Sequence, residues 1–315
     1  MFKSLTSAAA LALALSVGSA FAADLPSYKS PPPPPPPPPP MWTGFYIGLN
    51  AGYTWSGSNS VGIVTSPLFF NPLALVGTTS FGSASALGAT GVLPVNTSGF
   101  IGGGQIGYNW QFGNRFVAGV EADIQGVAGS NNRATATTAV GTPAFPGSFV
   151  VTTLNVSKRL DYLGTVRGRL GFLVTPTLLV YGTGGLAYGG VNSSTTIAQA
   201  AVGPATFTIN APYFGAGAFS DTRVGWTAGG GGEWMFLPNW SAKVEYLYYN
   251  LGNVTYSNGV LANIATPPGG AVPTGGVFYA LTSQSTTRYN GHIVRAGLNY
   301  HFNWGAPTPA VYAKY

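Results

Sequence analysis

The sequence predicts an all-β protein: an eight-stranded antiparallel up-and-down transmembrane β-barrel, preceded by a signal peptide and a polyproline linker. Three observations predict this fold. Segments in which apolar and polar residues alternate recur along the chain, as in strands with one apolar and one polar face. Only 6% of the 315 residues are charged, whereas roughly a quarter are charged in a typical soluble domain. The connections between the segments are alternately long and short, which is the order found in membrane barrels.

The first 22 residues are expected to be a secretory signal peptide. Lys3 supplies a positive charge, residues 8–17 form a short apolar run, and Ala20-Phe21-Ala22 matches a cleavage site. The alternative is an uncleaved membrane anchor, but the apolar run is too short to span a bilayer comfortably. Residues 1–22 are therefore excluded from the fold.

Residues 23–41 are expected to form a Pro-rich periplasmic linker. Pro31–Pro40 is an unbroken proline run, which can join neither a helix nor a sheet ladder and should adopt polyproline II. This run is either a semi-rigid spacer or a docking segment for a periplasmic or cell-wall partner.

The barrel is expected over residues 42–302, and its first two strands are 45–54 and 100–112. One face of the first strand carries Phe45, Ile47, Leu49, Ala51 and Tyr53. One face of the second carries Phe100, Ile106, Tyr108, Trp110 and Phe112. The intervening residues 56–98 are rich in Gly, Ser, Asn, Thr and Pro without sustained alternation, which predicts a long loop.

The third and fourth strands are expected at 115–127 and 157–172. Gly113-Asn114 predicts a tight hairpin before the third strand, because both residues tolerate positive φ. Residues 128–156 predict a second long loop. The apolar faces of the two strands carry Phe116, Ala118, Val120, Ala122 and Ile124, and Leu160, Tyr162, Val166, Leu170 and Phe172, respectively.

The fifth strand, 178–190, follows a tight turn at Thr175-Pro176-Thr177. Its alternation is weaker, because Leu179 and Tyr181 would point inward while Val180, Leu186 and Tyr188 point outward. Residues 191–220 predict the third long loop.

The last three strands are expected at 221–236, 240–251 and 289–302. A turn at Leu237-Pro238-Asn239 joins the first two, and a fourth long loop, 252–288, precedes the last. Their outward faces carry Val224, Trp226, Trp234 and Phe236; Trp240, Val244, Tyr246 and Tyr248; and Val294, Leu298, Tyr300 and Phe302. Aromatic residues recur beside the short turns, which predicts an aromatic girdle at that membrane boundary.

Charged residues within the strands fall mostly on the inward face. The candidates are Glu121, Asp123, Arg159, Asp161, Arg167, Arg169, Arg223, Glu233, Lys243, Glu245 and Arg295. The interior of an eight-stranded barrel is only wide enough for side chains to fill, and an unpaired buried charge is strongly destabilising. The sequence therefore predicts an interior salt-bridge network, which either fills the barrel or forms a narrow, gated conduit.

Cofactor, metal and nucleic-acid sites are not expected. Gly102-x-Gly104-x-x-Gly107 matches a dinucleotide fingerprint in letters, but a strand follows it where that motif requires a helix. His292 and His301 are the only histidines, and no cluster has the spacing of metal ligands. The formal charge of +6 comes from scattered basic residues, which argues against nucleic-acid binding. A catalytic group of His292 with Ser283 or Ser285 would lack a nearby carboxylate, so an enzyme is not expected.

Residues Trp42–Tyr53 and His292–Phe302 resemble the first and last strands of RopB-type outer-membrane proteins, which are opacity- and OmpA-like barrels of the "porin family". The resemblance implies an eight-stranded barrel in the Gram-negative outer membrane, involved in envelope integrity, surface interaction or limited permeation. The alternation of long and short connections predicts extracellular loops and periplasmic termini. Such barrels commonly end on a terminal aromatic residue, whereas this chain continues over residues 303–315. Either Phe302 is the recognition aromatic and a tail follows it, or Tyr315 takes that role.

The sequence thus favours a non-enzymatic outer-membrane barrel, monomeric, with a role in envelope structure or surface interaction. Its expected partners are outer-membrane lipids and lipopolysaccharide. The alternatives are a low-conductance porin for small polar solutes and a lipid-modifying barrel enzyme.

Overall fold

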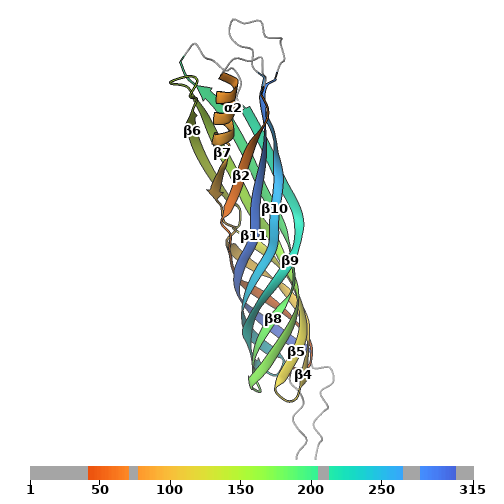
Figure 1. Ribbon diagram of the computed structural model, residues 1–315. Helices are drawn as coiled ribbons and strands as arrows, with labels where there is room; N and C mark the ends of the chain where they lie inside the picture. The colour runs from red at the N-terminus through yellow and green to blue at the C-terminus, as the bar shows by residue number, and fades with distance from the viewer. Residues whose placement is uncertain (1–41, 71–76, 205–212, 265–276, 303–315) are drawn as a thin grey trace, which may run out of the picture. The chain divides into compact units, whose positions relative to one another are not determined.

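The computed structural model describes residues 42–70, 77–204, 213–264 and 277–302 (Figure 1). The expected signal peptide at 1–22, the linker at 23–41 and the tail at 303–315 lie outside the described residues.

The described strands form one antiparallel sheet that closes on itself (Figure 1). Around the closed path, each strand pairs with the next one along the chain that belongs to the path. The path returns from its last strand to its first, through pairs running from Phe45↔Phe302 to Ser56↔Gly291. An up-and-down barrel is therefore confirmed. The path contains β1 (Gly44–Ser56), β4 (Gly99–Phe112), β5 (Phe116–Ala128), β7 (Phe149–Thr175), β8 (Leu178–Val202), β9 (Tyr213–Leu237), β10 (Trp240–Ile264) and β11 (Val277–Phe302).

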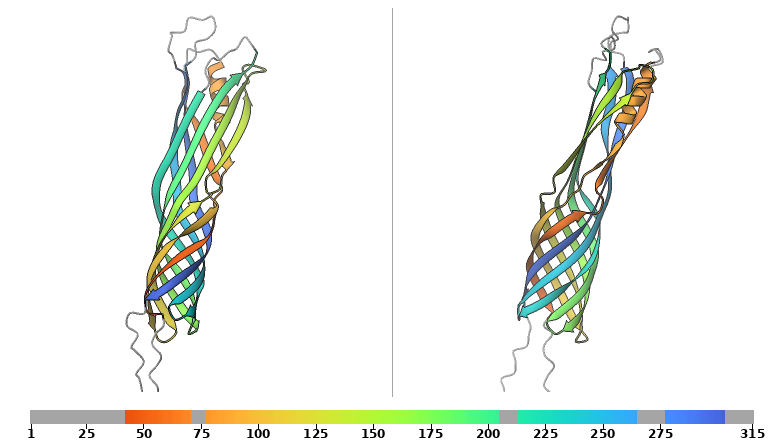
Figure 2. Two further views of the ribbon diagram at one scale, coloured as in Figure 1. Left: turned by 180° about the vertical axis from the view of Figure 1, so that it is seen from behind. Right: turned by 90° about the vertical axis from the view of Figure 1, so that its left-hand side faces the viewer.

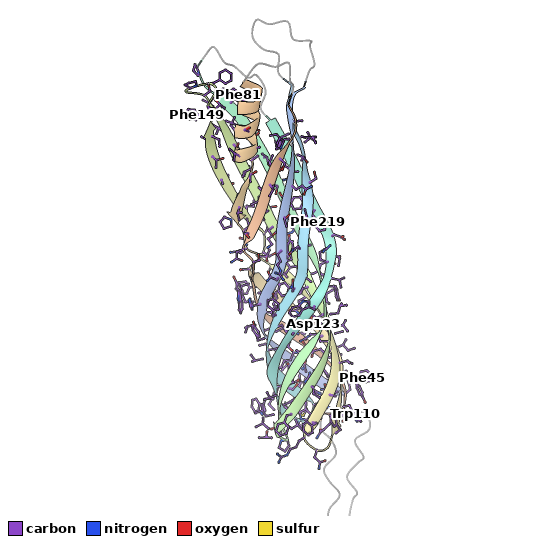
Figure 3. All side chains as sticks on the ribbon, viewed as in Figure 1. Phe45, Phe81, Trp110, Asp123, Phe149 and Phe219 are labelled. Atoms are coloured by element: carbon purple, nitrogen blue, oxygen red, sulfur yellow. The ribbon has the colours of Figure 1, made fainter. Side chains whose placement is uncertain are left out.

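The outer surface of the barrel carries two rows of exposed aromatic side chains, one at each end of an apolar wall. Figure 3 shows Phe45 and Trp110 at the end that carries the short turns. The turn-side aromatic row contains Phe45, Tyr108, Trp110, Phe112, Phe116, Phe172, Trp234, Phe236 and Trp240. The far aromatic row contains Tyr53, Trp55, Phe100, Trp226 and Tyr246. Between the rows the exposed side chains are aliphatic, or the wall is formed by Gly and Ala.

A tight turn joins β4 and β5 at the predicted place, and Gly113 and Asn114 have the expected positive φ, of 55° and 60°. The turn is one residue longer than the predicted two-residue hairpin. The flanking strands pair only as far as Phe112↔Phe116, which leaves Gly113, Asn114 and Arg115 in the loop.

The prediction of irregular long loops is wrong for much of their length. Residues 56–98 contain β2 (Ser60–Phe70), α2 (Gly77–Gly88) and β3 (Gly91–Pro94), and residues 128–156 contain β6 (Asn132–Gly141). Strands β7 to β11 are 25 to 27 residues long and continue well past the ends of β1, β4 and β5 (Figure 2). We call these continuations, together with β2, β3, β6 and α2, the extension.

The extension has an apolar core of its own. β2 pairs with β11 and β6 pairs with β7, while α2 places Phe81 and Ala84 in the core. Helix and sheet are also joined by polar contacts, because Gln199 Nε2 donates to the Ser85 carbonyl at 2.8 Å. The other core residues are Val61, Ile63, Ala89, Leu93, Val95, Val150, Leu154, Val156, Ile197, Leu261 and Leu281.

The outer face of the extension carries more polar side chains than the barrel wall and few charges. Large apolar side chains are also exposed on it, namely Val64, Leu68, Leu87, Val92, Phe149, Val202, Phe214 and Val260. Hydrogen bonds link side chains across neighbouring strands, such as Thr135 to Asn155 at 2.7 Å and Thr255 to Thr286 at 3.0 Å. A polar outer face over an apolar core is the pattern of a sheet in water. The exposed side chains are therefore almost all apolar below the far aromatic row and largely polar above it.

Two irregularities in pairing mark this change. The register of β7 with β8 shifts between Leu160 and Tyr162, and that of β10 with β11 shifts between Asn250 and Gly252. A bulge adds one residue to one strand, so residues beyond it face the side opposite to that predicted by simple alternation.

No helix among the described residues is long and apolar enough to cross a membrane.

Candidate functional site: the interior charge network

Eight charged side chains converge inside the barrel, and all are almost completely buried. Each projects from an inward position of β5, β7, β9, β10 or β11. Asp123, labelled in Figure 3, lies midway along the barrel, between Trp110 at the turn end and Phe219. The four carboxylates and four cations have formal charges that sum to zero. They are Glu121, Asp123, Glu233 and Glu245, and Arg167, Arg169, Lys243 and Arg295. We call this set the charge network.

Two arginines hold the centre of the charge network. The Arg167 guanidinium contacts three carboxylates: Nη2 lies 2.5 Å from Glu121 Oε1 and 2.9 Å from Asp123 Oδ2, and Nη1 lies 2.9 Å from Glu245 Oε1. Arg295 Nη2 lies 2.6 Å from Glu245 Oε2 and 2.9 Å from Asp123 Oδ2. Each carboxylate here therefore has more than one cationic partner, which offsets the cost of burying its charge.

Glu121 also joins the centre to the turn-side part of the network. Lys243 Nζ lies 2.8 Å from both of its carboxylate oxygens, and the Tyr46 hydroxyl donates to Oε2 at 2.7 Å. Arg169 donates to Tyr46 Oη at 2.9 Å and to Glu233 Oε2 at 2.6 Å. Its guanidinium lies 4.4 Å from the centroid of the Tyr181 ring, a distance that allows cation–π attraction.

Ser241, His301 and Glu233 meet at the turn-side edge of the network without forming a catalytic relay. Ser241 Oγ donates to Glu233 Oε1 at 2.5 Å and lies 2.8 Å from His301 Nε2. In a catalytic triad the histidine stands between the hydroxyl and the carboxylate, whereas here the hydroxyl contacts the carboxylate directly. All three side chains are buried, so this group serves as internal support.

Apolar layers enclose the charge network on both sides. The turn-side layer contains Trp42, Val117, Leu173, Leu179, Tyr181 and Met235. Trp42 closes it, with its backbone N–H on Gln111 Oε1 at 3.2 Å and its indole N–H on the Pro176 carbonyl at 3.0 Å. The far layer contains Ile101, Leu160, Leu163, Ala187, Val191, Leu247, Tyr249, Leu251, Val254, Tyr256, Tyr289 and Ile293. Side chains thus fill the barrel at three successive levels.

Three predicted members of the network lie elsewhere. Arg159 and Asp161 pair with each other at the surface, with Nε and Oδ1 separated by 2.5 Å. The bulge between Leu160 and Tyr162 turns them away from the interior. Arg223 lies where the β9–β10 ladder has ended, and its Nη2 donates to the Asn253 carbonyl at 3.1 Å.

Several uncharged residues of the network were not predicted as site residues. Tyr46, Thr165 and Asn299 contact its carboxylates through hydroxyl or amide groups. Their inward positions follow from the same alternation that selects the charged residues. A polar residue at an inward-facing position of a strand was therefore the sequence feature that could have identified them.

The serine and histidine considered for lipid chemistry are not brought together. Ser283 and Ser285 are buried inside the extension, where both accept hydrogen bonds from Asn258 Nδ2. His292 lies on the outside, with its ring stacked on Trp55 at 5.5 Å and its Nδ1 2.7 Å from Tyr246 Oη.

Comparison with known proteins identifies a family and several relatives. A family model described as an outer membrane protein beta-barrel domain matches residues 7–302. The "31 kDa outer-membrane immunogenic protein" of Brucella melitensis is 34% identical over 288 residues, covering 90% of this chain and 94% of the relative. The "22 kDa outer membrane protein" of Rhizobium leguminosarum bv. viciae is 31% identical over 52% of this chain and 62% of the relative. Among solved structures, OprG from Pseudomonas aeruginosa matches with 9% identity and a TM-score of 0.35, covering 82% of this chain and 97% of OprG.

Proposed function

Because the chain belongs to the family of outer-membrane protein beta-barrel domains, we propose that it is a closed, non-enzymatic barrel with a structural or surface-interaction role. In this proposal the eight strands of the closed path cross the outer membrane between the two aromatic rows. The proposed spanning segments are 45–55, 100–112, 116–124, 162–174, 180–188, 224–236, 240–248 and 292–302.

The nature of the wall supports this placement. Each proposed segment is close to the ten or so residues that a transmembrane β-strand needs, and aromatic rows are typical of both membrane interfaces. A lipid-facing Arg or Lys at the bilayer midplane would cost about 2–4 kcal/mol. The four cations of the network avoid that cost by facing inward, and so do the four carboxylates, for which the cost is smaller.

The alternation of short turns with long connections supports an orientation. Outer-membrane barrels have short periplasmic turns and longer extracellular loops, so we place the turn-side aromatic row at the periplasm and the extension outside the cell. We also propose that the barrel is monomeric, that it contacts lipopolysaccharide, and that Pro31–Pro40 is a periplasmic spacer or partner-binding segment.

One observation carries the proposal that the barrel is closed: buried side chains fill it at three levels, with the charge network between two apolar layers. Purified protein in planar lipid bilayers should therefore produce no discrete current steps. Reproducible steps from the wild-type protein would contradict a closed barrel. A porin of known conductance in the same bilayers is the positive control.

A narrow conduit is the second candidate function. Arg169 Nε and Arg295 Nη1 are buried without a hydrogen-bond acceptor among the described residues, and Glu121 contacts four cations that could exchange partners. Exchange within the network would not by itself open the two apolar layers. A conduit therefore predicts that Arg167→Ala raises conductance, whereas a closed barrel predicts lower stability and background conductance.

A further inference from the structure

We propose that the free edge of β6 binds an extended segment of a partner polypeptide, which adds to the sheet as a further strand. β6 lies in the extension, at the end away from the short turns (Figure 1). The inference deepens the proposed surface-interaction role and rests on it, because the extension must lie outside the cell for such a partner to reach it. We call this site the β6 edge.

The β6 edge exists because the sheet of the extension is not closed as the barrel is. Its strands form two groups, with β6, β7, β8 and β9 in one and β10, β11, β2 and β3 in the other. The ladder between β9 and β10 ends at the pair Trp226↔Asn250. Among the described strands, β6 pairs with β7 alone and β3 with β2 alone. One side of β6 therefore has no strand beside it in a ladder.

Alternate residues of β6 direct their backbone groups toward the β6 edge. In an antiparallel ladder, every second residue is hydrogen-bonded to the partner strand. The Thr142 N–H donates to the Ser148 carbonyl at 3.0 Å in the connection from β6 to β7, so counting back in steps of two makes the even-numbered residues those bonded to β7. The odd-numbered residues from 133 to 139 thus turn their N–H and C=O groups to the β6 edge.

The β6 edge lacks the features that protect the edge of the other group. β3 is only four residues long and ends at Pro94, and β2 contains Pro67 beside a register shift. β6 has ten residues and no proline, and it pairs with β7 without a register shift. Short strands, prolines and bulges are common means of keeping an edge from pairing. An edge without them is open to an added strand.

The two faces of β6 define the pattern of the added strand. On the inner face, Ala134, Ala136 and Val140 pack against the apolar core of the extension but are only partly buried. Alternate apolar residues of an added strand would continue this core. On the outer face, Thr135 and Thr137 are exposed and uncharged. The intervening residues of the added strand would lie beside them, where uncharged polar side chains fit.

Charge complementarity adds a third feature to the partner. Arg133 is the one charged residue of β6, and its side chain is exposed. No carboxylate of the described residues pairs with it, whereas Arg159 on β7 is paired with Asp161. The partner that fits the β6 edge is therefore an extended segment with apolar residues on one side, uncharged polar residues on the other and a carboxylate beside Arg133.

A fluorescent peptide tests this inference on the full-length folded protein in neutral detergent, with fluorescence anisotropy as the measure of binding. It has the sequence of residues 149–158 with Ser157→Asp. These residues of β7 already pair with β6, so their alternation suits it, and Ser157 is the register partner of Arg133. The control peptide is methylated on the backbone nitrogens of positions 151, 153 and 155, which would face the β6 edge. We expect saturable binding of the first peptide and at least about tenfold weaker binding of the control, because it lacks these donors.

The variant pair for this test is Thr137→Pro against Thr137→Val. Both variants lose the hydroxyl that lies 3.3 Å from Thr153 Oγ1. Proline also removes the N–H that faces the β6 edge, while the bonds to β7 remain. We expect Thr137→Pro to bind the peptide at least about tenfold more weakly and Thr137→Val to bind it like the wild type. Heat-dependent gel migration and resistance of the extension to limited proteolysis show whether each variant is folded.

A charge variant tests the third feature of the partner. Arg133→Gln should weaken binding of the aspartate peptide by about threefold, the size expected for an exposed ion pair. It should leave binding of the unmodified peptide of residues 149–158 unchanged. Equal loss for both peptides, or no loss for either, would contradict the assigned charge complementarity.

Four results would overturn the inference: no saturable binding, equal binding by Thr137→Pro and Thr137→Val, equal binding of the methylated peptide, or self-association at the β6 edge that excludes the peptide. The second and third would indicate adsorption through side chains, and the fourth that a second copy of the chain is the occupant. If Thr137→Pro does not fold, the methylated peptide decides. Failure of the proposed function is separately visible, because protease added to whole cells cuts the extension only if the membrane placement is correct, whatever the peptide measurement shows.

Discussion

Replacing Arg167 by methionine removes the cation with the most partners in the charge network. Its guanidinium contacts Glu121, Asp123 and Glu245, and its Nε donates to Thr165 Oγ1 at 2.8 Å. Methionine retains much of the apolar volume but leaves a net charge of −1 in the interior.

The expected loss of stability follows from the contacts that remain. Removing one partner of a buried ion pair costs about 3–5 kcal/mol, because a buried charge is left uncompensated. After the change, Glu121 keeps Lys243 and Asp123 keeps Arg295, which places the cost near the lower end of that range. Adding Glu245→Gln restores a net charge of zero. The double variant should therefore be more stable than the sum of the two single effects predicts.

Urea unfolding of the protein in lipid vesicles, followed by tryptophan fluorescence, measures these free energies. Arg115→Met is the matched control. Arg115 is an exposed arginine in the β4–β5 turn, 6.0 Å from the centroid of the Phe172 ring, and its loss should cost no more than about 1 kcal/mol. Equal costs for the two variants, or strict additivity in the double variant, would refute the role assigned to Arg167.

Three further predictions concern the layers around the network. Trp42→Ala should lower the free energy of unfolding by about 3–5 kcal/mol without producing current in planar bilayers, because the far apolar layer remains; current steps would contradict the two-layer closure. Phe81→Ala should make the extension sensitive to limited proteolysis while the barrel keeps its heat-dependent gel shift; loss of both together would show one cooperative unit. Lys158, above the spanning segments, is buried against the Ser58 and Arg288 carbonyls, and burial lowers its pKa from 10.5 to about 8. Between these values the unfolded chain binds a proton that the folded chain does not, so stability should fall as pH decreases from 10.5 to about 8. Lys158→Met should remove that slope in urea titrations, and an unchanged slope would show that another group causes it.

The barrel strands and most of the charge network could be predicted because both depend on alternation. Arg167 and Arg169 share a face with every second residue of their strand, and that face cannot be lipid-facing without a large cost. The same rule failed at Arg159 and Asp161, because the register shift at this point of β7 comes from its pairing with β8 and leaves no mark in the sequence.

The elements of the extension were missed for a different reason. β6 carries Thr, Ala, Gly and Val with little contrast between its faces, as in Asn132–Gly141, so its strand character depends on pairing with β7. α2 is similarly rich in Gly, Ser and Thr, residues with weak helix propensity. The core beside it, around Phe81 and Leu93, stabilises this segment. The local periodicity of the sequence does not reveal tertiary contacts of this kind.

The distribution of charge over the strands has a consequence for assembly. β5 contributes two carboxylates and β7 two cations, so these neighbours are neutral together. β9 then adds Glu233, and β10 adds Lys243 and Glu245, so the summed charge of these inward side chains is −1. Arg295, on β11, brings this sum to zero. A chain truncated before its last strand would carry an uncompensated carboxylate into the bilayer. The interior becomes neutral only when the last strand is present. This favours insertion of the complete barrel over insertion hairpin by hairpin.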